Sequence, residues 1–319
     1  MALGKFDGVN AANIGKAASL SSSSIGNING SQLLLGAWST TSSASNSRSY
    51  SAGCGNVNDT LSFGGYNGSW LSVTDKWDGA TWSYVANLPT WYGSNNGVSK
   101  LTGFGTTAAA IACGGQDKDG NNCGTVAKWN GASWTITGGT YGRIGWVGCG
   151  STSSGLMWGG NGGGGISDTK VLVAQWNGVD GWTTLNSLNN AVQVMGGCGT
   201  TSAAMSFGGH NGSARVAITE KWNGSSWSTA QSLSQSRYGL SGVGTTTAAM
   251  AISGSTGSYT STPAAVTTVE KWNGTAWATT NSVNVGREGC SSSGDADSAL
   301  SFLGATGSGT VVGTTEIWA

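Results

Sequence analysis

The residues of this chain that could do chemistry are few, which limits the reactions it can support. The sequence has a single histidine, His210, in the segment GGHNGSAR. A Ser-His-Asp hydrolase would depend on that one side chain, and no nucleophile-elbow motif accompanies it. A copper centre built from histidine, tyrosine and cysteine needs more than one histidine. We therefore expect no catalytic residue, no bound metal and no cofactor.

The acidic residues do not suggest a catalytic pair either. Glycoside hydrolysis needs two carboxylates about 5 to 9.5 Å apart, and the acids are too scattered along the chain to name such a pair. Four of them recur just before a tryptophan: Asp75, Glu220, Glu270 and Glu316. Asp117 and Asp119 lie in QDKDGNN, which resembles a calcium loop but lacks glycine at the sixth position and a carboxylate at the twelfth. The favoured structure for that segment is a hairpin turn.

Composition excludes several classes of partner. Only 9% of the 319 residues are Asp, Glu, Lys or Arg, and 14 basic residues balance 14 acidic ones. This balance attracts neither nucleic acid nor an anionic membrane. No run of about 18 apolar residues predicts a transmembrane helix, and residues 1–30 lack the apolar core of a secretory signal. We expect no nucleic-acid partner, no membrane insertion and no signal peptide.

A tryptophan hairpin recurs along the chain, for example as KWNGSSW from Lys221. Asn-Gly between apolar residues is typical of a tight β-hairpin turn, because both residues tolerate positive φ. The first tryptophans of five copies follow one another at steps of 46 to 52 residues: Trp77, Trp129, Trp176, Trp222 and Trp272. The two tryptophans of each hairpin are expected to face each other across its strands.

A second unit, a short apolar strand that ends in glycine, precedes each hairpin. Its closing glycines define six repeats: Gly65, Gly115, Gly160, Gly209, Gly254 and Gly304. The residue ten positions earlier is glycine in all six repeats, which indicates positive φ or backbone crowding. The residue seventeen positions earlier is arginine in four of them: Arg48, Arg143, Arg237 and Arg287.

Each repeat predicts four short antiparallel strands, so the chain is predicted to be an all-β, six-bladed β-propeller. The last repeat stops at Trp318 without a hairpin partner, while Trp38 near the start is a second tryptophan without a first. We expect the N-terminal strand to complete the last blade, which removes the open sheet edges. Residues 36–319 then form the propeller, and residues 1–35 form an N-terminal arm or linker.

The six cysteines fall into different settings. Cys54, Cys149 and Cys198 occupy one position in three repeats, so they should be buried free thiols on a ring rather than paired. Cys113 and Cys123 instead end and begin the two strands that QDKDGNN joins. A disulfide between these two is compatible with that spacing.

The repeat resembles the kelch motif over about residues 36–319, in its arginine, its strand of small residues, its glycine pair and its two later aromatic residues. Kelch repeats commonly have tyrosine where this chain has Trp77, and Ser253 and Leu303 replace the first glycine in the last two repeats. The WNGxxW turns and GTxxAAM-like stretches at low charge are similar to kelch-like repeats of bacteriophage and other environmental virion proteins.

Length variation concentrates in the connections that lead to the first tryptophan of each hairpin. These connections share one face of the blades with the connections between blades, and binding sites commonly lie on such loops. Loop aromatics that could stack on sugars or anchor a protein, with polar neighbours, are the candidate ligand-binding residues: Tyr66, Trp70, Trp91, Tyr92, Asp117, Asp119, His210 and Asn211.

The resemblance and these features favour a non-enzymatic virion protein, a phage tail or capsid appendage made in the host cytoplasm. As an adhesin or a decoration protein, it would bind a host-surface glycan or receptor, or a neighbouring virion protein. Residues 1–35 would contact other virion proteins. Two other classes stay open, namely a hydrolase or lyase that acts on polysaccharide in the central cleft and a bacterial kelch-like interaction scaffold.

Overall fold

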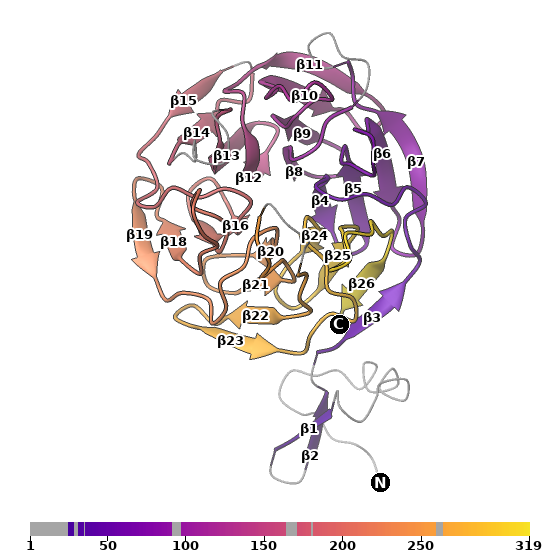
Figure 1. Ribbon diagram of the computed structural model, residues 1–319, viewed down its shortest axis with the longest axis vertical. Coiled ribbons are helices and arrows are strands. Elements are labelled where there is room, and N and C mark those ends of the chain that lie inside the picture. The colour runs from indigo at the N-terminus through magenta and orange to yellow at the C-terminus, as the bar shows by residue number, and fades with distance from the viewer. Residues whose placement is uncertain are drawn as a thin grey trace.

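The computed structural model describes residues 25–28, 31–34, 36–90, 97–163, 171–179, 181–259 and 264–319. Six four-stranded antiparallel sheets stand radially around a central axis (Figure 1). This arrangement confirms the six-bladed β-propeller that the repeats predict. In each blade the strands run from an inner strand beside the axis to an outer strand at the rim.

The blades are numbered in the chain order of their inner strands. Blades 1 and 2 contain β4 (Ala52–Asn56), β5 (Asp59–Phe63), β6 (Val73–Trp77) and β7 (Trp82–Asn87), then β8 (Thr102–Gly105), β9 (Ala110–Cys113), β10 (Thr125–Trp129) and β11 (Trp134–Gly139). Blades 3 and 4 contain β12 (Ile144–Ser151), β13 (Ser154–Asn161), β14 (Val173–Trp176) and β15 (Trp182–Thr184), then β16 (Gly196–Gly199), β17 (Ala204–Phe207), β18 (Thr219–Trp222) and β19 (Trp227–Ala230). Blades 5 and 6 contain β20 (Ser241–Gly244), β21 (Ala249–Ile252), β22 (Val269–Trp272) and β23 (Trp277–Thr280), then β24 (Ser291–Gly294), β25 (Ala299–Phe302), β26 (Thr315–Trp318) and β3 (Trp38–Thr41).

The N-terminal strand of the ring, β3, closes blade 6 as predicted. It pairs antiparallel with β26, with Trp38 opposite Trp318, and the centroids of these two rings are 5.7 Å apart. The closure joins the first and last strands of the propeller, so it removes the edge that an incomplete last blade would expose. Two further strands, β1 (Ile25–Ile28) and β2 (Ser31–Leu34), form a separate hairpin ahead of the ring.

The hairpin tryptophans join neighbouring blades. The first one donates its indole N–H to a carbonyl in the turn between the first two strands of its own blade, as Trp77 does to Val57 at 2.9 Å. The second one reaches the preceding blade: Trp82 packs against Phe302 at 5.0 Å and donates to Thr315 Oγ1 at 2.9 Å. Trp134 and Trp277 make the same bond to the preceding blade, whereas the buried N–H groups of Trp38, Trp182 and Trp227 have no partner among the described residues. Because their rings fill the space between two sheets, the tryptophans act as structural residues.

The core consists of clusters that each draw residues from two adjacent blades. The acids before the first tryptophans share one position in the third strand of their blades, and their side chains are buried. Three blades contain an ion pair between that acid and the recurring arginine: Arg48–Asp75 at 2.6 Å, Arg237–Glu270 at 2.5 Å and Arg287–Glu316 at 3.0 Å. Blade 3 has Ala174 in place of the acid, and Arg143 donates instead to the carbonyls of Gly159 and Gly160.

The glycine that recurs ten residues before the closing glycine is required by both predicted reasons. Its φ lies between 103° and 120° in all six blades. In blade 4, for example, a Cβ on Gly199 would collide with the carbonyl oxygen of Ala203.

Within the described residues there is no helix of the length and apolarity that crossing a membrane requires.

The disulfide between Cys113 and Cys123 is not formed, because both residues are free thiols. Cys113 pairs in register with Val126, so Cys123 lies outside the paired part of the two strands. The two side chains also enter different cores: Cys113 lies between blades 2 and 3, and Cys123 lies between blades 1 and 2. Side chains on opposite faces of one sheet cannot be bridged. The buried, unpaired state predicted for Cys54, Cys149 and Cys198 is confirmed.

Candidate functional site

A closed ring of backbone hydrogen bonds surrounds the axis where the inner strands begin. Its six residues lie fifteen positions before the closing glycines: Tyr50, Lys100, Gly145, Val194, Gly239 and Gly289. Each donates its N–H to the carbonyl oxygen of its counterpart in the preceding blade, at 2.6 to 2.9 Å. Each also has a left-handed φ, between 48° and 63°. We call these six residues the axial ring.

The axial ring holds three residues that are not glycine in a conformation that favours glycine. Left-handed φ costs such residues on the order of 1 kcal/mol or more, and the cost is greatest for a β-branched residue such as Val194. The six hydrogen bonds link all the blades and offset this cost. Tyr50, Lys100 and Val194 are therefore presented at the axis against a local backbone preference, which is frequent at functional sites.

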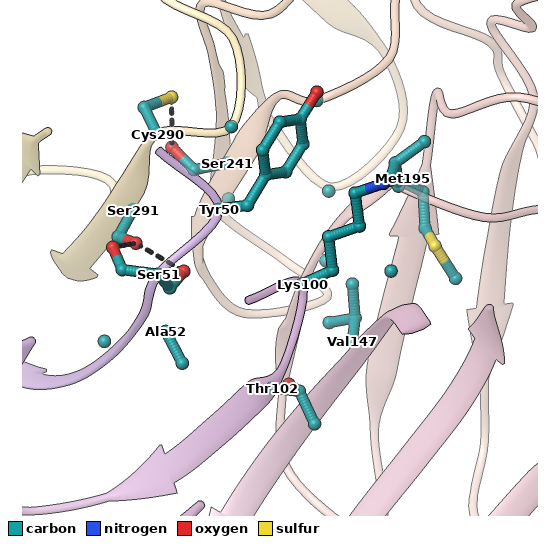
Figure 2. Close-up of a pocket in the computed structure, with 18 of the residues that line it drawn as sticks. Tyr50, Ser51, Ala52, Lys100, Thr102, Val147, Met195, Ser241, Cys290 and Ser291 are labelled. Carbon is teal, nitrogen blue, oxygen red and sulfur yellow. Dashed lines mark hydrogen bonds between the residues drawn. The ribbon is translucent and has the colours of Figure 1, made fainter. Parts of the chain in front are cut away.

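On one side of the axial ring, the inner strands line a narrow central channel of about 160 Å³. Figure 2 shows this region, in which small side chains dominate the wall. The hydroxyl oxygens of Ser51 and Ser291 lie 3.0 Å apart, and the Cys290 thiol donates to Ser241 Oγ at 3.5 Å. Among the described residues that line the channel, Lys100 alone is charged.

A second hollow, of about 350 Å³, adjoins the axial ring on the face that carries the connections between blades. We call it the axial cavity. Its polar and aromatic lining comes from four blades: Lys100, Gln116, Asn122, Asn161, Gln193 and Tyr259. Most of these residues lie in connections between the second and third strands or at the entry to an inner strand. The hollow thus lies on the face where the sequence predicts binding, although none of the predicted residues that the structure describes lines it.

Lys100 is shared by the two hollows, since it lines both the channel and the axial cavity. Its ammonium nitrogen lies 5.6 Å from the centre of the Tyr50 ring, and Figure 2 shows the two side chains beside each other at the axis. Burial lowers the pKa of Lys100, and the nearby Glu288 carboxylate opposes that effect. The Tyr50 hydroxyl donates to Glu288 Oε1 at 3.2 Å. Burial and Glu288 raise the pKa of Tyr50, so this hydroxyl stays protonated at neutral pH.

His210, Tyr238 and Tyr259 form an aromatic cluster next to the axial cavity. The ring centroids of His210 and Tyr259 are 4.9 Å apart, and those of Tyr238 and Tyr259 are 5.1 Å apart. His210 is a loop residue but is only 6% exposed, so its side chain is buried. Its Nδ1 accepts the Gly212 N–H at 3.0 Å, and burial lowers its pKa. Since burial also raises the pKa of Tyr259 to about 12, the cluster presents neutral rings at pH 7.

The candidates of blades 1 and 2 lie in neighbouring loops. Tyr66 and Trp70 contact each other edge to face at 4.9 Å, and Trp70 borders, with Lys118, a groove of about 500 Å³. Asp117 is 2% exposed, and its Oδ1 accepts the N–H groups of Asp119 and Asn121 at 3.0 and 2.9 Å. Asp117 thus closes the turn that the sequence favours there, while Asp119 pairs with Lys118 at 2.6 Å.

The remaining candidates do not join these in one site. Asn211 is exposed, and its side-chain oxygen accepts the backbone N–H groups of its own loop at 2.8 and 2.9 Å. Blades 1 and 4, which carry the candidates Tyr66 and Asn211, stand on opposite sides of the axis (Figure 1). Trp91 and Tyr92 lie outside the described residues. Within the described ranges, no three His, Cys, Asp or Glu side chains gather as metal ligands.

The residues at the axis were missed by the sequence reasoning. The sequence points to aromatic and polar residues in the variable loops. Tyr50, Lys100 and Glu288 lie elsewhere, just before the inner strands of their blades. One signal could have indicated Tyr50 and Lys100, since the axial-ring position is glycine in three repeats and Tyr50, Lys100 and Val194 depart from that pattern. Their convergence, however, depends on how the six blades meet.

No protein-family model matches this chain, and no curated protein matches it. Among solved structures, that of YjhT is similar with a TM-score of 0.71 and 12% sequence identity. The match covers 86% of this chain and 96% of YjhT. At this identity the likeness shows the β-propeller fold alone.

Proposed function

We propose that this protein is a non-enzymatic binding protein with kelch-like repeats, carried on the tail or capsid surface of a bacteriophage or a related virion. Its loop face binds a glycan of the host surface, and residues 1–35 attach it to neighbouring virion proteins. The observation that carries glycan binding is the axial cavity, which opens among the loops and has walls of amide side chains, a lysine and a tyrosine ring.

The chemistry of these walls suits a sugar. The amides of Gln116, Asn122, Asn161 and Gln193 contain both donors and acceptors, as hydroxyl recognition requires. Tyr259 adds an aromatic surface. A volume of about 350 Å³ lies at the lower end of the range for small-ligand pockets. The resemblance of the low-charge repeats to virion kelch-like repeats supports the particle location.

Glycan binding is tested with an array of host-surface glycans, followed by titration of any glycan that binds. The wild-type protein is expected to bind a subset of the array, and Gln116→Ala should weaken that binding. Gln235→Ala, which removes an exposed amide of a loop outside the cavity lining, is the matched control. Absence of binding to all host glycans would contradict the proposal.

The virion location is tested separately, by mass spectrometry of purified particles. The protein should be present in a fixed ratio to the other particle proteins, and its absence would defeat this part of the proposal. Incubation with host polysaccharides addresses the enzyme alternative, because released oligosaccharide would favour a hydrolase or lyase.

A further inference from the structure

Lys100 is the one charged residue among the described residues that line the axial cavity. Burial raises the pKa of Tyr259 to about 12, so this hydroxyl is uncharged at pH 7. The remaining polar side chains of the lining are neutral amides: Gln116, Asn122, Asn161 and Gln193. The described lining of the cavity therefore has one positive charge and no negative charge.

The ammonium group of Lys100 is not used by the described part of the chain. No hydrogen bond and no ion pair within 4.0 Å joins it to a described residue. Its charge lies 5.6 Å from the centre of the Tyr50 ring, and a ring face takes none of its three N–H donors as an ordinary hydrogen bond. Burial lowers the pKa of Lys100 because it removes water from the ammonium. An anionic oxygen in the cavity would compensate for that lost hydration.

Glu288 acts on the charge of Lys100 from outside the cavity. It does not line the cavity, and its Oε2 is buried. Its Oε1 accepts from the Tyr50 hydroxyl at 3.2 Å, and Tyr238 also shares a side-chain hydrogen bond with this carboxylate. Glu288 therefore favours the protonated form of Lys100 and leaves the ammonium donors to a ligand.

Two other acids lie close to the lining in the chain but bind within their own loop. Asp117 and Asp119 come between Gln116 and Asn122, yet neither of them lines the axial cavity. Asp117 Oδ1 accepts two backbone N–H groups of the loop at 2.9 and 3.0 Å. Asp119 pairs with Lys118 at 2.6 Å. An anionic ligand thus meets no carboxylate in the described lining.

The amides of the lining add hydrogen-bond acceptors beside this ammonium. Gln116 Nε2 donates to the Gly120 carbonyl at 3.2 Å, and Asn122 Nδ2 donates to the Asn161 carbonyl at 3.2 Å. The side-chain oxygens of Gln116 and Asn122 accept from no described residue. Such oxygens accept from hydroxyl groups. A cationic donor next to amide acceptors is the complement of a carboxylate that is surrounded by hydroxyl groups.

We propose that the axial cavity binds a hexuronic acid unit of a glycan, with the carboxylate accepting from Lys100 Nζ and sugar hydroxyls donating to the side-chain oxygens of Gln116 and Asn122. One ammonium matches one carboxylate in charge. A cavity of about 350 Å³ is small among ligand pockets and suits a single sugar unit better than an extended chain. This inference rests on the proposed glycan-binding function and names its sugar class and its binding residues.

The test uses the full-length protein with glucuronate and galacturonate as probes. Glucuronamide has nearly the shape of glucuronate without its charge, so it is the matched neutral comparison. Glucose 6-sulfate is the comparison with a different anionic group. Saturation-transfer NMR detects binding, and calorimetry measures the dissociation constant of each sugar.

Three variants of lysine residues assign the charge. Lys100→Met removes the ammonium and keeps the length of the side chain, whereas Lys100→Arg keeps the charge. Lys76→Met is the matched control, because Lys76 pairs with Asp59 at 3.2 Å on blade 1 and lines neither the channel nor the axial cavity. Circular dichroism and thermal unfolding establish that each variant is folded.

The wild type is expected to bind at least one of the two uronates, and to bind glucuronamide more weakly than glucuronate by about ten-fold or more, as expected for loss of a hydrogen bond between charged groups. Lys100→Met should weaken uronate binding by a similar factor, Lys100→Arg should weaken it less, and Lys76→Met should bind as the wild type does. Added salt should weaken uronate binding to the wild type more than to Lys100→Met, because salt screens the attraction between charges.

Several results would overturn the inference. Absence of binding to both uronates, or glucuronamide binding as tightly as glucuronate, would refute the sugar class. Tighter binding of glucose 6-sulfate than of either uronate would also refute it. Equal uronate affinity in the wild type and Lys100→Met would refute the assigned residue.

These results are distinct from failure of the proposed function. Binding of neutral host glycans that Gln116→Ala weakens and Lys100→Met does not would leave that function standing and refute the uronate. Uronate binding that depends on Lys100, without binding to any host glycan of the array, would support the site and refute the host-surface role.

Discussion

Replacement of Arg237 by valine is expected to destabilise the propeller strongly. Arg237 and Glu270 both have 0% of their side chains exposed and form an ion pair at 2.5 Å. Without the arginine, the described partners of Glu270 reduce to the Ser234 N–H, which donates to Oε2 at 2.7 Å. Loss of one partner of a buried pair costs about 3–5 kcal/mol. At about 2 °C per kcal/mol for a large domain, Tm should fall by about 6–10 °C.

Blade 2 provides an internal control for this change. It has Val98 and Ala127 at the two equivalent positions, and both are fully buried. The double variant Arg237→Val with Glu270→Ala therefore copies an arrangement that the protein already contains. Because it removes the buried carboxylate together with its cation, it should lower the free energy of unfolding by less than Arg237→Val alone.

Blade 4 provides a second control, because it keeps the acid without the arginine. There Glu220 accepts the Asn189 N–H at 3.2 Å and the Asn190 side-chain amide at 2.6 Å. Asn190 is equivalent to Gln235 of blade 5 by its place in the repeat. Adding Gln235→Asn to Arg237→Val should supply this amide and restore part of the lost stability.

The measurement is urea unfolding followed by tryptophan fluorescence, with calorimetry for Tm. It is made on the single variants Arg237→Val and Glu270→Ala and on the two double variants. The expected coupling between Arg237 and Glu270 is about 2 kcal/mol or more. The reasoning would be refuted if Arg237→Val with Glu270→Ala lost as much free energy of unfolding as the two single variants together. The cost would then come from lost packing rather than from an unpaired buried charge.

Three further predictions concern closure, backbone strain and thiols. Removal of residues 1–35 should leave Tm unchanged, whereas removal of residues 1–41 deletes β3 and the buried Trp38 and should lower Tm by about 6 °C or more. Gly199 has φ 120° and lies against the Ala203 carbonyl, whereas Gly68 has φ 106° but a Cβ there would meet no atom within 4 Å. Gly199→Ala should therefore lower the free energy of unfolding in urea more than Gly68→Ala does. Burial raises the pKa of Cys54 and of Cys149 to about 12. Both thiols should therefore stay protonated and unreactive toward a thiol reagent at pH 8, and gain reactivity only as the pH approaches their pKa. After unfolding without reductant, all six thiols should react.

Each of these has an outcome that would contradict it. Equal stability of the two truncated proteins would show that β3 contributes nothing to closure. Equal loss in Gly199→Ala and Gly68→Ala would mean that φ alone sets the cost and that the carbonyl contact is irrelevant. Rapid labelling of the native protein at pH 8, or fewer than six reactive thiols after unfolding, would contradict the burial or the free state of the cysteines.

The sequence by itself determined the architecture, because the features that specify it are local and repeated. A tight turn needs Asn-Gly or Asp-Gly, an inner strand needs a glycine at positive φ, and five copies of the turn with six of the glycine along the chain admit few closed arrangements. The two unpaired tryptophans, Trp38 and Trp318, indicated the closing strand for the same reason: each lacked a partner that every regular copy has.

The tertiary structure alone decided which side chains meet at the axis. Tyr50, Lys100 and Glu288 come from three blades, and no local pattern brings them together. It also decided that Cys113 and Cys123 point into different cores and that His210 is buried, because the face of a sheet to which a side chain points depends on strand register. A repeat predicts what every blade has in common, whereas a site at the centre of the ring is built from the residues in which the blades differ.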